Sequence, residues 1–306
     1  MGISVETFEQ HRRLLFGIAY RMLGSASEAE DVVQDAYLRA VGSRDAAIRE
    51  PGAFLATVVT RLCLDRLKAA RASREQYIGP WLPEPILLAP DGDAGEERAE
   101  RAETVGMAVL VLLETLSPLE RAVFLLRESF EYPFDEIGAM LNRSAAACRQ
   151  AYHRARAHLD AQRPRFRATP EQQQALVAGF LAAAREGNLA TLAGMLAHDV
   201  VCYSDGGGVV AAARKPIHGP AMVGRLFAGL MKQAKAIATP VYHTAPAWIN
   251  GTQGLLVWAD ERLDAVWVFG CGPSAIETIW VVRNPAKLAY LGGRVDPPRD
   301  TPALLR

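Results

Sequence analysis

The stretch FEYPFDEIGAMLNRSAAACRQAYHRARAHL, residues 130–159, contains the pattern that is most informative about fold. Residues 134–141 predict a short helix, residues 142–143 a turn, and Ser144 the N-cap of a second helix. The exposed polar residues expected on that second helix are Arg149, Gln150, His153, Arg154 and Arg156. Two short helices joined by a tight turn, the second one basic, are typical of a helix-turn-helix whose second helix enters the DNA major groove. An ordinary basic helical hairpin is the plainer alternative.

The segment LSPLERAVFLL, residues 116–126, predicts the supporting helix of this motif, because Ser117 and Pro118 form a cap followed by a first-turn proline. In such a motif the first half of the second helix reaches base edges, and the later arginines contact phosphates.

The charge distribution supports binding to nucleic acid, although the net charge is zero, with 34 basic and 34 acidic residues among 306. Residues 61–74 carry a net charge of +4 and residues 143–167 carry +6, whereas residues 91–103 carry −4. Two basic segments separated by an acidic one are consistent with two DNA-contacting helices on either side of a linker.

The chain divides into regions of different character. Up to about residue 168 the apolar residues recur every three or four positions, which predicts helices, with Ser27 as one N-cap and Pro51 as the start of another helix. A segment rich in proline and glycine, residues 76–103, interrupts this pattern. It contains WLPEPILL, which is too apolar for a simple spacer.

Beyond Pro170 two helices, 171–185 and 188–197, precede several segments typical of antiparallel strands. These segments are VVCYS, GLLVWAD, LDAVWVFG and AIETIWVVR. They predict an α+β domain. We therefore expect a multidomain chain, with two all-α helical modules followed by an α+β domain.

The four cysteines, Cys63, Cys148, Cys202 and Cys271, form no CxxC pair and are expected to be buried, with no metal, disulfide or cofactor. The chain contains no run of eighteen apolar residues and no secretory signal at its N-terminus. These features predict a cytoplasmic protein without a membrane partner.

Taken together, the first 168 residues resemble the extracytoplasmic-function (ECF) class of RNA polymerase sigma factors. AEDVVQDAYLRA, residues 29–40, is similar to the segment that binds core polymerase at the β′ clamp helices. The resemblance assigns this role to Asp31, Gln34 and Asp35, whereas a solvated acidic first turn is the plainer interpretation. Residues 104–163 resemble the domain that recognises the −35 element, which would use Ser144 and the five polar residues named above.

Residues 51–75 are similar to the helix that reads and opens the −10 element, and the preceding loop, 41–50, to the loop that holds a flipped base. The resemblance implies −10 DNA contacts at Arg61, Arg66, Lys68 and Arg71. Many relatives have Asn in place of Arg61, so no base contact is assigned there. Residues 1–75 are accordingly expected to form sigma domain 2, and residues 76–103 the linker.

Three short motifs resemble those of ECF sigma factors fused to a SnoaL-like domain: YIGPWLPEP (77–85), DGGG (205–208) and NPAKL (284–288). The resemblance implies that residues 169–306 form a cone-shaped α+β barrel of the cystatin/NTF-like type, and that its motifs contact the linker. The residues expected in this regulatory contact are Trp81, Leu82, Pro83, Glu84, Pro85, Asp205, Gly206, Gly207, Gly208, Asn284, Pro285, Lys287 and Leu288. DGGG lacks the Lys-Ser/Thr of a phosphate-binding P-loop; a flexible turn remains an alternative.

The SnoaL-like fold also occurs in polyketide cyclases and ketosteroid isomerases, which use a carboxylate or histidine inside an apolar pocket. Candidate residues for such chemistry are Tyr203, Asp205, His218, His243 and Asp264, near Trp248, Trp258, Trp267 and Trp280. They show no diagnostic spacing, so a catalytic domain with a DNA-binding appendage is the alternative to a non-enzymatic sigma factor. A repressor that does not bind polymerase would need a dimer seam, and none is evident.

We therefore predict a sigma factor, monomeric when free, that directs core RNA polymerase to promoter DNA. Its C-terminal domain modulates this activity, with a small ligand as one candidate signal.

Overall fold

The computed structural model describes residues 3–42, 48, 50–88, 106–160, 168–236 and 239–297, without the side chains at 42 and 71–75. The chain forms two compact units. The helical unit comprises Met1–Gln76 and Val109–Arg163, and the α+β unit comprises Tyr77–Ala108 and Pro164–Arg306. Among the described residues, no helix has the length and apolarity that a membrane span requires.

The helical unit begins with three helices that pack on one another: α1 (Val5–Leu23), α2 (Ala26–Gly42) and α3 (Pro51–Glu75). The first proline of α3 lies where it was predicted. The N-cap of α2 does not, because the Ser25 hydroxyl accepts the hydrogen bond from the Glu28 amide at 3.1 Å. The predicted cap, Ser27, instead exchanges a hydrogen bond with Ser25.

The same unit contains α6 (Pro118–Glu128), α7 (Phe134–Leu141) and α8 (Ala145–Asp160); α5 (Met107–Leu113) precedes them. A capping box between Ser117 and Glu120 begins α6, and the Ser144 hydroxyl accepts a hydrogen bond from the Ala147 amide at the start of α8. The turn between α7 and α8 contains Asn142 in the left-handed region, at φ 54°. The helix-turn-helix predicted from the sequence is confirmed, including the bounds of its first helix.

Helices α6 and α7 pack against α1 and α3, so the two halves of the helical unit are in contact. The guanidinium of Arg61 on α3 donates hydrogen bonds to the carbonyls of Met140 at 2.8 Å and Ala139 at 3.2 Å, near the end of α7. Arg121 on α6 is buried. It donates to the Met22 carbonyl at 2.8 Å and to the Glu114 carboxylate.

The α+β unit contains one six-stranded sheet in the order β2-β1-β6-β5-β4-β3. Its strands are β1 (Leu196–Asp205), β2 (Ile217–His218), β3 (Tyr242–Ile249), β4 (Thr252–Ala259), β5 (Arg262–Cys271) and β6 (Ile276–Val282). The predicted strand segments fall in β1, β4, β5 and β6, which confirms the α+β class. The expectation of antiparallel pairing is wrong for one pair, because β1 and β6 are parallel. Hairpin signals identify neighbours along the chain, whereas β1 pairs with the last strand.

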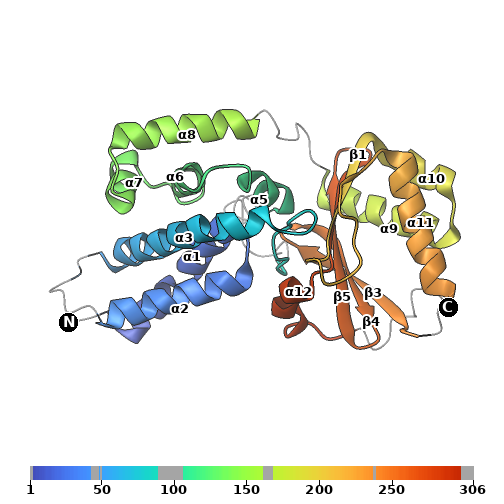
Figure 1. The fold of residues 1–306 in the computed structure, drawn as a ribbon, viewed down its shortest axis with the longest axis horizontal. Coiled ribbons are helices and arrows are strands. Elements are labelled where there is room, and N and C mark those ends of the chain that lie inside the picture. Colours follow the sequence, from blue (N-terminus) through green and yellow to red (C-terminus); the bar gives the residue numbers. More distant parts are fainter. Residues whose placement is uncertain are drawn as a thin grey trace. The chain divides into compact units, whose positions relative to one another are not determined.

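Three helices cover one face of this sheet: α9 (Pro170–Glu186), α10 (Leu189–Gly194) and α11 (Pro220–Ala236) (Figure 1). The core between these layers is apolar, and its centre is aromatic. The Phe227 ring lies 5.1 Å from that of Phe180 and 4.9 Å from that of Trp267, both edge-on. Burying each such side chain contributes about 1.5–3 kcal/mol or more, so this layer supplies much of the domain's hydrophobic stabilisation. The last helix, α12 (Pro285–Gly292), packs against β5.

Candidate functional site

The linker segment 77–88 lies on the α+β unit in an extended conformation. Near its end it pairs with the turn between β3 and β4: the Asn250 amide donates to the Ile86 carbonyl at 3.0 Å, and the Leu88 amide to the Trp248 carbonyl at 3.0 Å. The Ile86 amide in turn donates to the Asn250 side-chain oxygen. Because β3 is one of the two edge strands, the linker satisfies backbone groups that the sheet leaves unpaired.

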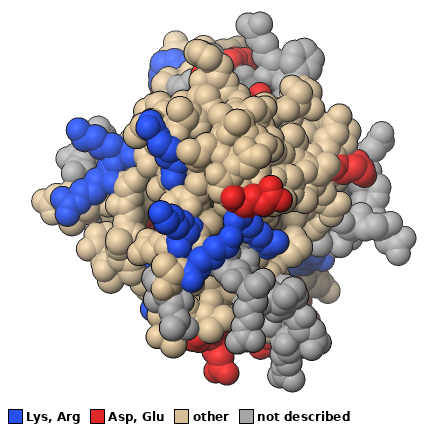
Figure 2. Space-filling view, turned by 90° about the vertical axis from the view of Figure 1, so that its right-hand side faces the viewer, with Lys and Arg blue, Asp and Glu red and all other residues tan. Residues whose placement is uncertain are grey.

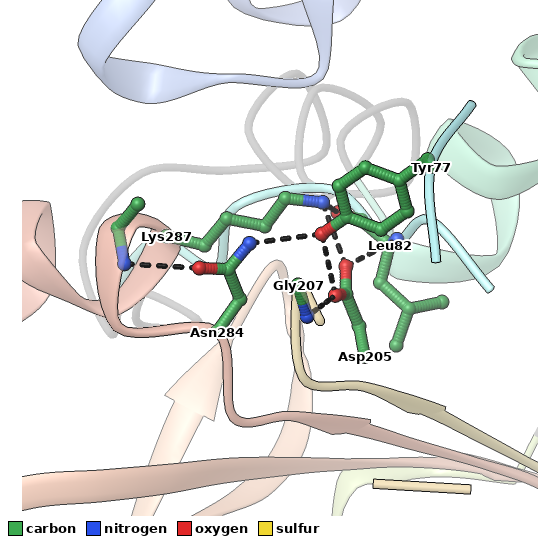
Figure 3. A network of polar contacts seen from close by, with 7 residues as sticks. Tyr77, Leu82, Asp205, Gly207, Asn284 and Lys287 are labelled. Atoms are coloured by element: carbon green, nitrogen blue, oxygen red, sulfur yellow. Dashed lines mark hydrogen bonds and ion pairs between the residues drawn. The ribbon is translucent and has the colours of Figure 1, made fainter. Parts of the chain in front are cut away.

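Asp205, the last residue of β1, connects the linker to the domain (Figure 3). Its side chain is completely buried, and its two oxygens accept different partners. Oδ1 accepts from the Tyr77 hydroxyl at 2.6 Å and from the Gly207 amide at 3.0 Å. Oδ2 accepts from the Leu82 amide at 2.9 Å and from the Lys287 ammonium at 2.7 Å. A buried carboxylate is stable only when it is paired and hydrogen-bonded, and these four partners meet that requirement.

Lys287 on α12 supplies the compensating charge. Its ammonium also donates to the Leu82 carbonyl at 2.5 Å, so both backbone groups of Leu82 are bound by the domain. The same nitrogen lies 4.0 Å from the centre of the Trp81 ring and 5.0 Å from that of Tyr77, which places it between two aromatic faces. The contact therefore recognises linker backbone and linker side chains together.

Asn284 completes the network at the N-cap of α12. Its oxygen accepts from the Ala286 amide at 3.0 Å, and its amide nitrogen donates to the Tyr77 hydroxyl at 2.8 Å. Burial raises the pKa of the Tyr77 hydroxyl above its usual range, and the hydrogen bond to the Asp205 carboxylate acts in the same direction. Tyr77 therefore stays neutral and serves as a hydrogen-bond donor.

The glycine loop after Asp205 is tightly packed. Gly207 and Gly208 have φ of 63° and 73°, a region that favours glycine. A Cβ on Gly207 would overlap the Asn284 side chain, and a Cβ on Gly208 would come within 2.9 Å of the Ile78 side chain. A Cβ on Gly206 would overlap the Val210 carbonyl. Gly207 and Gly208 therefore permit close packing against Asn284 and the linker, and Gly206 permits close packing within its own loop.

The other residues predicted for this contact lie close by. Leu82, Pro83, Glu84 and Pro85 are buried, and Trp81 is half-buried. Leu288 is buried in α12, which Pro285 begins. Sequence reasoning did not assign a contact to Tyr77 or Ile78, although Tyr77 belongs to the motif that was quoted. An aromatic hydroxyl next to an apolar linker was the signal available.

The predicted polymerase-binding residues lie on α2. Asp31 and Gln34 are exposed, and Asp35 is half-buried. The Asp35 carboxylate accepts from the Arg66 guanidinium of α3 at 2.8 Å. Leu38, one helical turn beyond Gln34, is 61% exposed. The exposed face of α2 therefore combines polar residues with an apolar one that sequence reasoning missed.

The residues predicted for −10 DNA contacts lie along α3. Arg61 binds the end of α7 as described above, and Arg66 binds Asp35 and the Glu28 carbonyl. Lys68 is exposed and lies 3.4 Å from Asp65. The side chain of Arg71 and most of the loop 41–50 lie outside the described residues.

The predicted −35 residues lie on the exposed side of α8. Spacings of four and three residues place Arg149, His153 and Arg156 on one face, next to Gln150. Arg156 donates to the Tyr152 hydroxyl at 3.1 Å. Arg154 lies towards one side of this face, where it binds the Glu120 carboxylate at 2.9 Å. The opposite side of α8 is buried, including Cys148, and the face that carries the predicted residues is exposed.

The residues proposed for catalysis do not converge on a site. His218 is on β2 and His243 on β3, at opposite edges of the sheet. Asp264 binds the Arg283 guanidinium at 2.8 Å, and Asp205 belongs to the linker network. Of the tryptophans, Trp267 lies in the aromatic core and Trp258 is buried, as is Trp280. Burial raises the pKa of the Cys202 and Cys271 thiols to about 12, consistent with unreactive packing residues.

Comparison with known proteins identifies the class. Residues 7–73 match the family model described as Sigma-70 region 2, and residues 106–159 match that described as Sigma-70, region 4. The chain is 38% identical over 295 residues to the ECF RNA polymerase sigma factor SigJ of Mycobacterium tuberculosis (strain ATCC 25618 / H37Rv), covering 93% of each chain. It therefore belongs to the ECF RNA polymerase sigma factors, proteins that bind core polymerase and promoter DNA to initiate transcription.

Two further comparisons extend this result. The probable ECF sigma factor SigI of Mycobacterium tuberculosis (strain CDC 1551 / Oshkosh) is 35% identical over 188 residues, which cover 60% of this chain and 63% of that protein. The crystal structure of Mycobacterium tuberculosis SigJ matches with a TM-score of 0.73 and 30% identity, over 94% of this chain and 98% of that one. The match includes the α+β unit, so the expected multidomain fold is confirmed.

Proposed function

We propose that the C-terminal α+β domain controls this sigma factor by fixing the linker between its two promoter-binding modules. The observation that carries the proposal is the bonding of Leu82, through its amide to Asp205 and through its carbonyl to Lys287. Simultaneous binding of the −10 and −35 elements gains from tethering only when the linker allows the correct spacing. A domain that binds one linker conformation shifts the population of chains able to do this.

Transcription in vitro tests this proposal. Purified core polymerase and a cognate promoter are combined with the full chain, with a chain ending at residue 168, and with Asp205→Asn. We expect both altered chains to change the yield of specific transcript in the same direction. Asp199→Asn is the matched control, because Asp199 lies on the same strand but is exposed. Equal transcript from all four proteins would refute control by the domain.

The exposed face of α2 is proposed to bind the clamp helices of the polymerase β′ subunit. Exposed Asp31 and Gln34 supply polar contacts, and Leu38 supplies an apolar one. Asp31→Lys and Leu38→Ser should each weaken capture of core polymerase, whereas Glu9→Lys, at an exposed position of α1, should not. Unchanged capture by both α2 variants would place the polymerase contact elsewhere.

The two DNA-binding surfaces are proposed to be α3 for the −10 element and the exposed face of α8 for the −35 element. Arg61 and Arg66 already bind backbone or side-chain groups of α7 and α2, so a DNA phosphate would share or replace these partners. DNA binding by α3 is therefore expected to compete with the contact between α3 and α7. Footprinting of the holoenzyme with Arg61→Gln tests whether loss of that contact changes protection of the −10 element.

We infer that the α+β domain acts without catalysis, because its candidate carboxylates are paired with cations and its candidate histidines lie at opposite sheet edges. The protein is proposed to work in the cytoplasm as a monomer when it is not bound to polymerase. A small ligand of this domain would act through the linker contact. Sedimentation of the free chain tests the monomeric state, and transcription with added cell metabolites tests the small ligand.

A further inference from the structure

A basic groove lies on the α+β unit between the end of α9 and the exposed side of α11. It encloses about 360 Å³. Its lining residues are Ala184, Arg185, Glu186, Gly187, Leu189, Arg225, Ala228, Gly229, Lys232 and Lys235. Four of them are cations and one is an acid, in a chain whose net charge is zero. The space-filling view towards this part of the molecule shows lysine and arginine side chains gathered on one face (Figure 2).

Among the described residues, the cations of the groove form no ion pair. Across the part of the chain that the structure describes, Arg185, Arg225, Lys232 and Lys235 have no carboxylate within ion-pair distance. Arg225 donates to the Ala221 carbonyl and the Met222 sulfur, and Lys235 donates to the Arg185 carbonyl. Arg185 and Lys235 lie in the last turns of their helices, where the helix dipole is by itself a sufficient reason for a cation. Helix stability does not account for Arg225, which lies in the first half of α11.

The floor of the groove is made of small residues. Positions 225, 228, 229 and 232 follow helical spacing, so Ala228 and Gly229 lie between Arg225 and Lys232 on one face of α11. A Cβ added at Gly229 or Gly187 would meet nothing within 4 Å. The groove therefore has room for a group to approach the helix backbone closely between flanking cations.

We propose that this groove binds phosphates of the DNA backbone outside the two promoter elements. Arginine and lysine are the side chains that contact phosphates, and a sequence-independent electrostatic contact needs no further chemistry. Arg225 and Lys232 are seven residues apart, which is about 10 Å along a helix. That distance corresponds to about three nucleotides along one strand of B-DNA. The protein already holds promoter DNA through its helical modules, so DNA is the polyanion available to it.

Salt-dependent DNA binding by the holoenzyme tests this proposal. Affinity is measured between about 50 and 200 mM salt for the full chain and for Arg225→Gln/Lys232→Gln. The matched control is Arg214→Gln/Lys215→Gln, which removes the same charge from exposed residues outside the groove. We expect the slope of log affinity against log salt to fall by about 1.8 for the groove variant, because each lost phosphate contact lowers it by about 0.9. The control should match the unaltered protein.

Two further arms distinguish binding of DNA phosphates from binding of a free phosphorylated ligand. Gly229→Leu fills the groove without changing charge and should weaken binding to long promoter fragments. Fragments trimmed to the two elements should abolish the difference between groove variant and unaltered protein. Equal slopes for groove and control variants would overturn the proposal. A second result would also overturn it: pyrophosphate raises the unfolding temperature of the unaltered protein but not of the groove variant, while the two proteins bind DNA equally. That result would indicate a free phosphorylated ligand. This experiment measures DNA affinity, whereas the test of linker control measures transcription by Asp205→Asn. The groove proposal can therefore fail independently of the proposed linker control.

Discussion

Replacing Asp205 by Asn should release the linker from the α+β domain while leaving the domain folded. The substitution keeps the shape of the side chain but removes the charge that compensates buried Lys287. It also replaces one carboxylate oxygen by an NH2 group, which is a donor. In one orientation of the amide this group faces the Leu82 amide and the Lys287 ammonium, and in the other it faces the Tyr77 hydroxyl and the Gly207 amide, so donors oppose donors in both. Removing one partner of a buried ion pair typically costs about 3–5 kcal/mol.

Part of this cost is recovered if the linker leaves, because Lys287 then gains access to water. A shift of about 3 kcal/mol in the docking equilibrium corresponds to roughly a hundredfold change, since about 1.4 kcal/mol is a factor of ten. Hydrogen exchange of the Leu82 amide measures this directly, because in the native protein that amide is bonded to Asp205. We expect its protection to fall by about two orders of magnitude.

The control is Asp199→Asn, and amides of the buried strand β5 serve as an internal standard for domain integrity. A second variant, Lys287→Met, tests the pairing, because the double variant should lose less than the sum of the single losses. Unchanged protection of Leu82 in Asp205→Asn, with intact β5, would refute the view that this carboxylate holds the linker.

Three other expectations follow from the structure. Gly207→Ala should destabilise the α+β unit more than Gly187→Ala in thermal unfolding. Both have positive φ, at an expected cost of about 1–2 kcal/mol, but only the first meets a side chain, that of Asn284. Linker docking should weaken as pH rises above about 10, because the folded-state pKa of Tyr77 is raised from 10.0 and ionisation then favours the undocked linker. Limited proteolysis of the linker at increasing pH measures this loss of docking. The increase in cleavage at high pH should be missing in Tyr77→Phe, and an increase that persists in this variant would assign the effect to another group. Arg149→Ala should reduce −35-specific binding by about 1–3 kcal/mol in competition assays. Arg154→Ala should have a smaller effect because Glu120 already binds that side chain, and equal losses would contradict this ranking.

The sequence predicted local features of the fold well. The helix-turn-helix, its Ser144 cap and the proline at the start of α3 depend on short-range patterns, and all are present. The N-cap of α2 was misplaced by two residues because Ser25 and Ser27 both suit that role, and only the backbone geometry selects between them. Helix α11 and strand β3 were not predicted.

The long-range contacts could be predicted only as far as motifs suggested them. The resemblance pointed to three segments, but it did not indicate that Asp205 would bind both Tyr77 and Leu82, or that Lys287 would lie against Trp81. Nor could the sequence show that Arg61 contacts α7, because the two residues joined there are 79 apart. Such contacts depend on the packing of whole units.

The position of Lys287 has a consequence for the order in which this protein becomes complete. The ribosome makes both promoter-binding modules and the linker first, and Asp205 emerges before its counter-ion. Asn284 and Lys287 follow Asp205 by 79 and 82 residues. A nascent chain that ends before residue 284 thus carries every predicted promoter contact, but it lacks the Lys287 ammonium that binds the Leu82 carbonyl and pairs with Asp205. Synthesis of the segment that contains Lys287 is therefore the step that completes the proposed control of the linker.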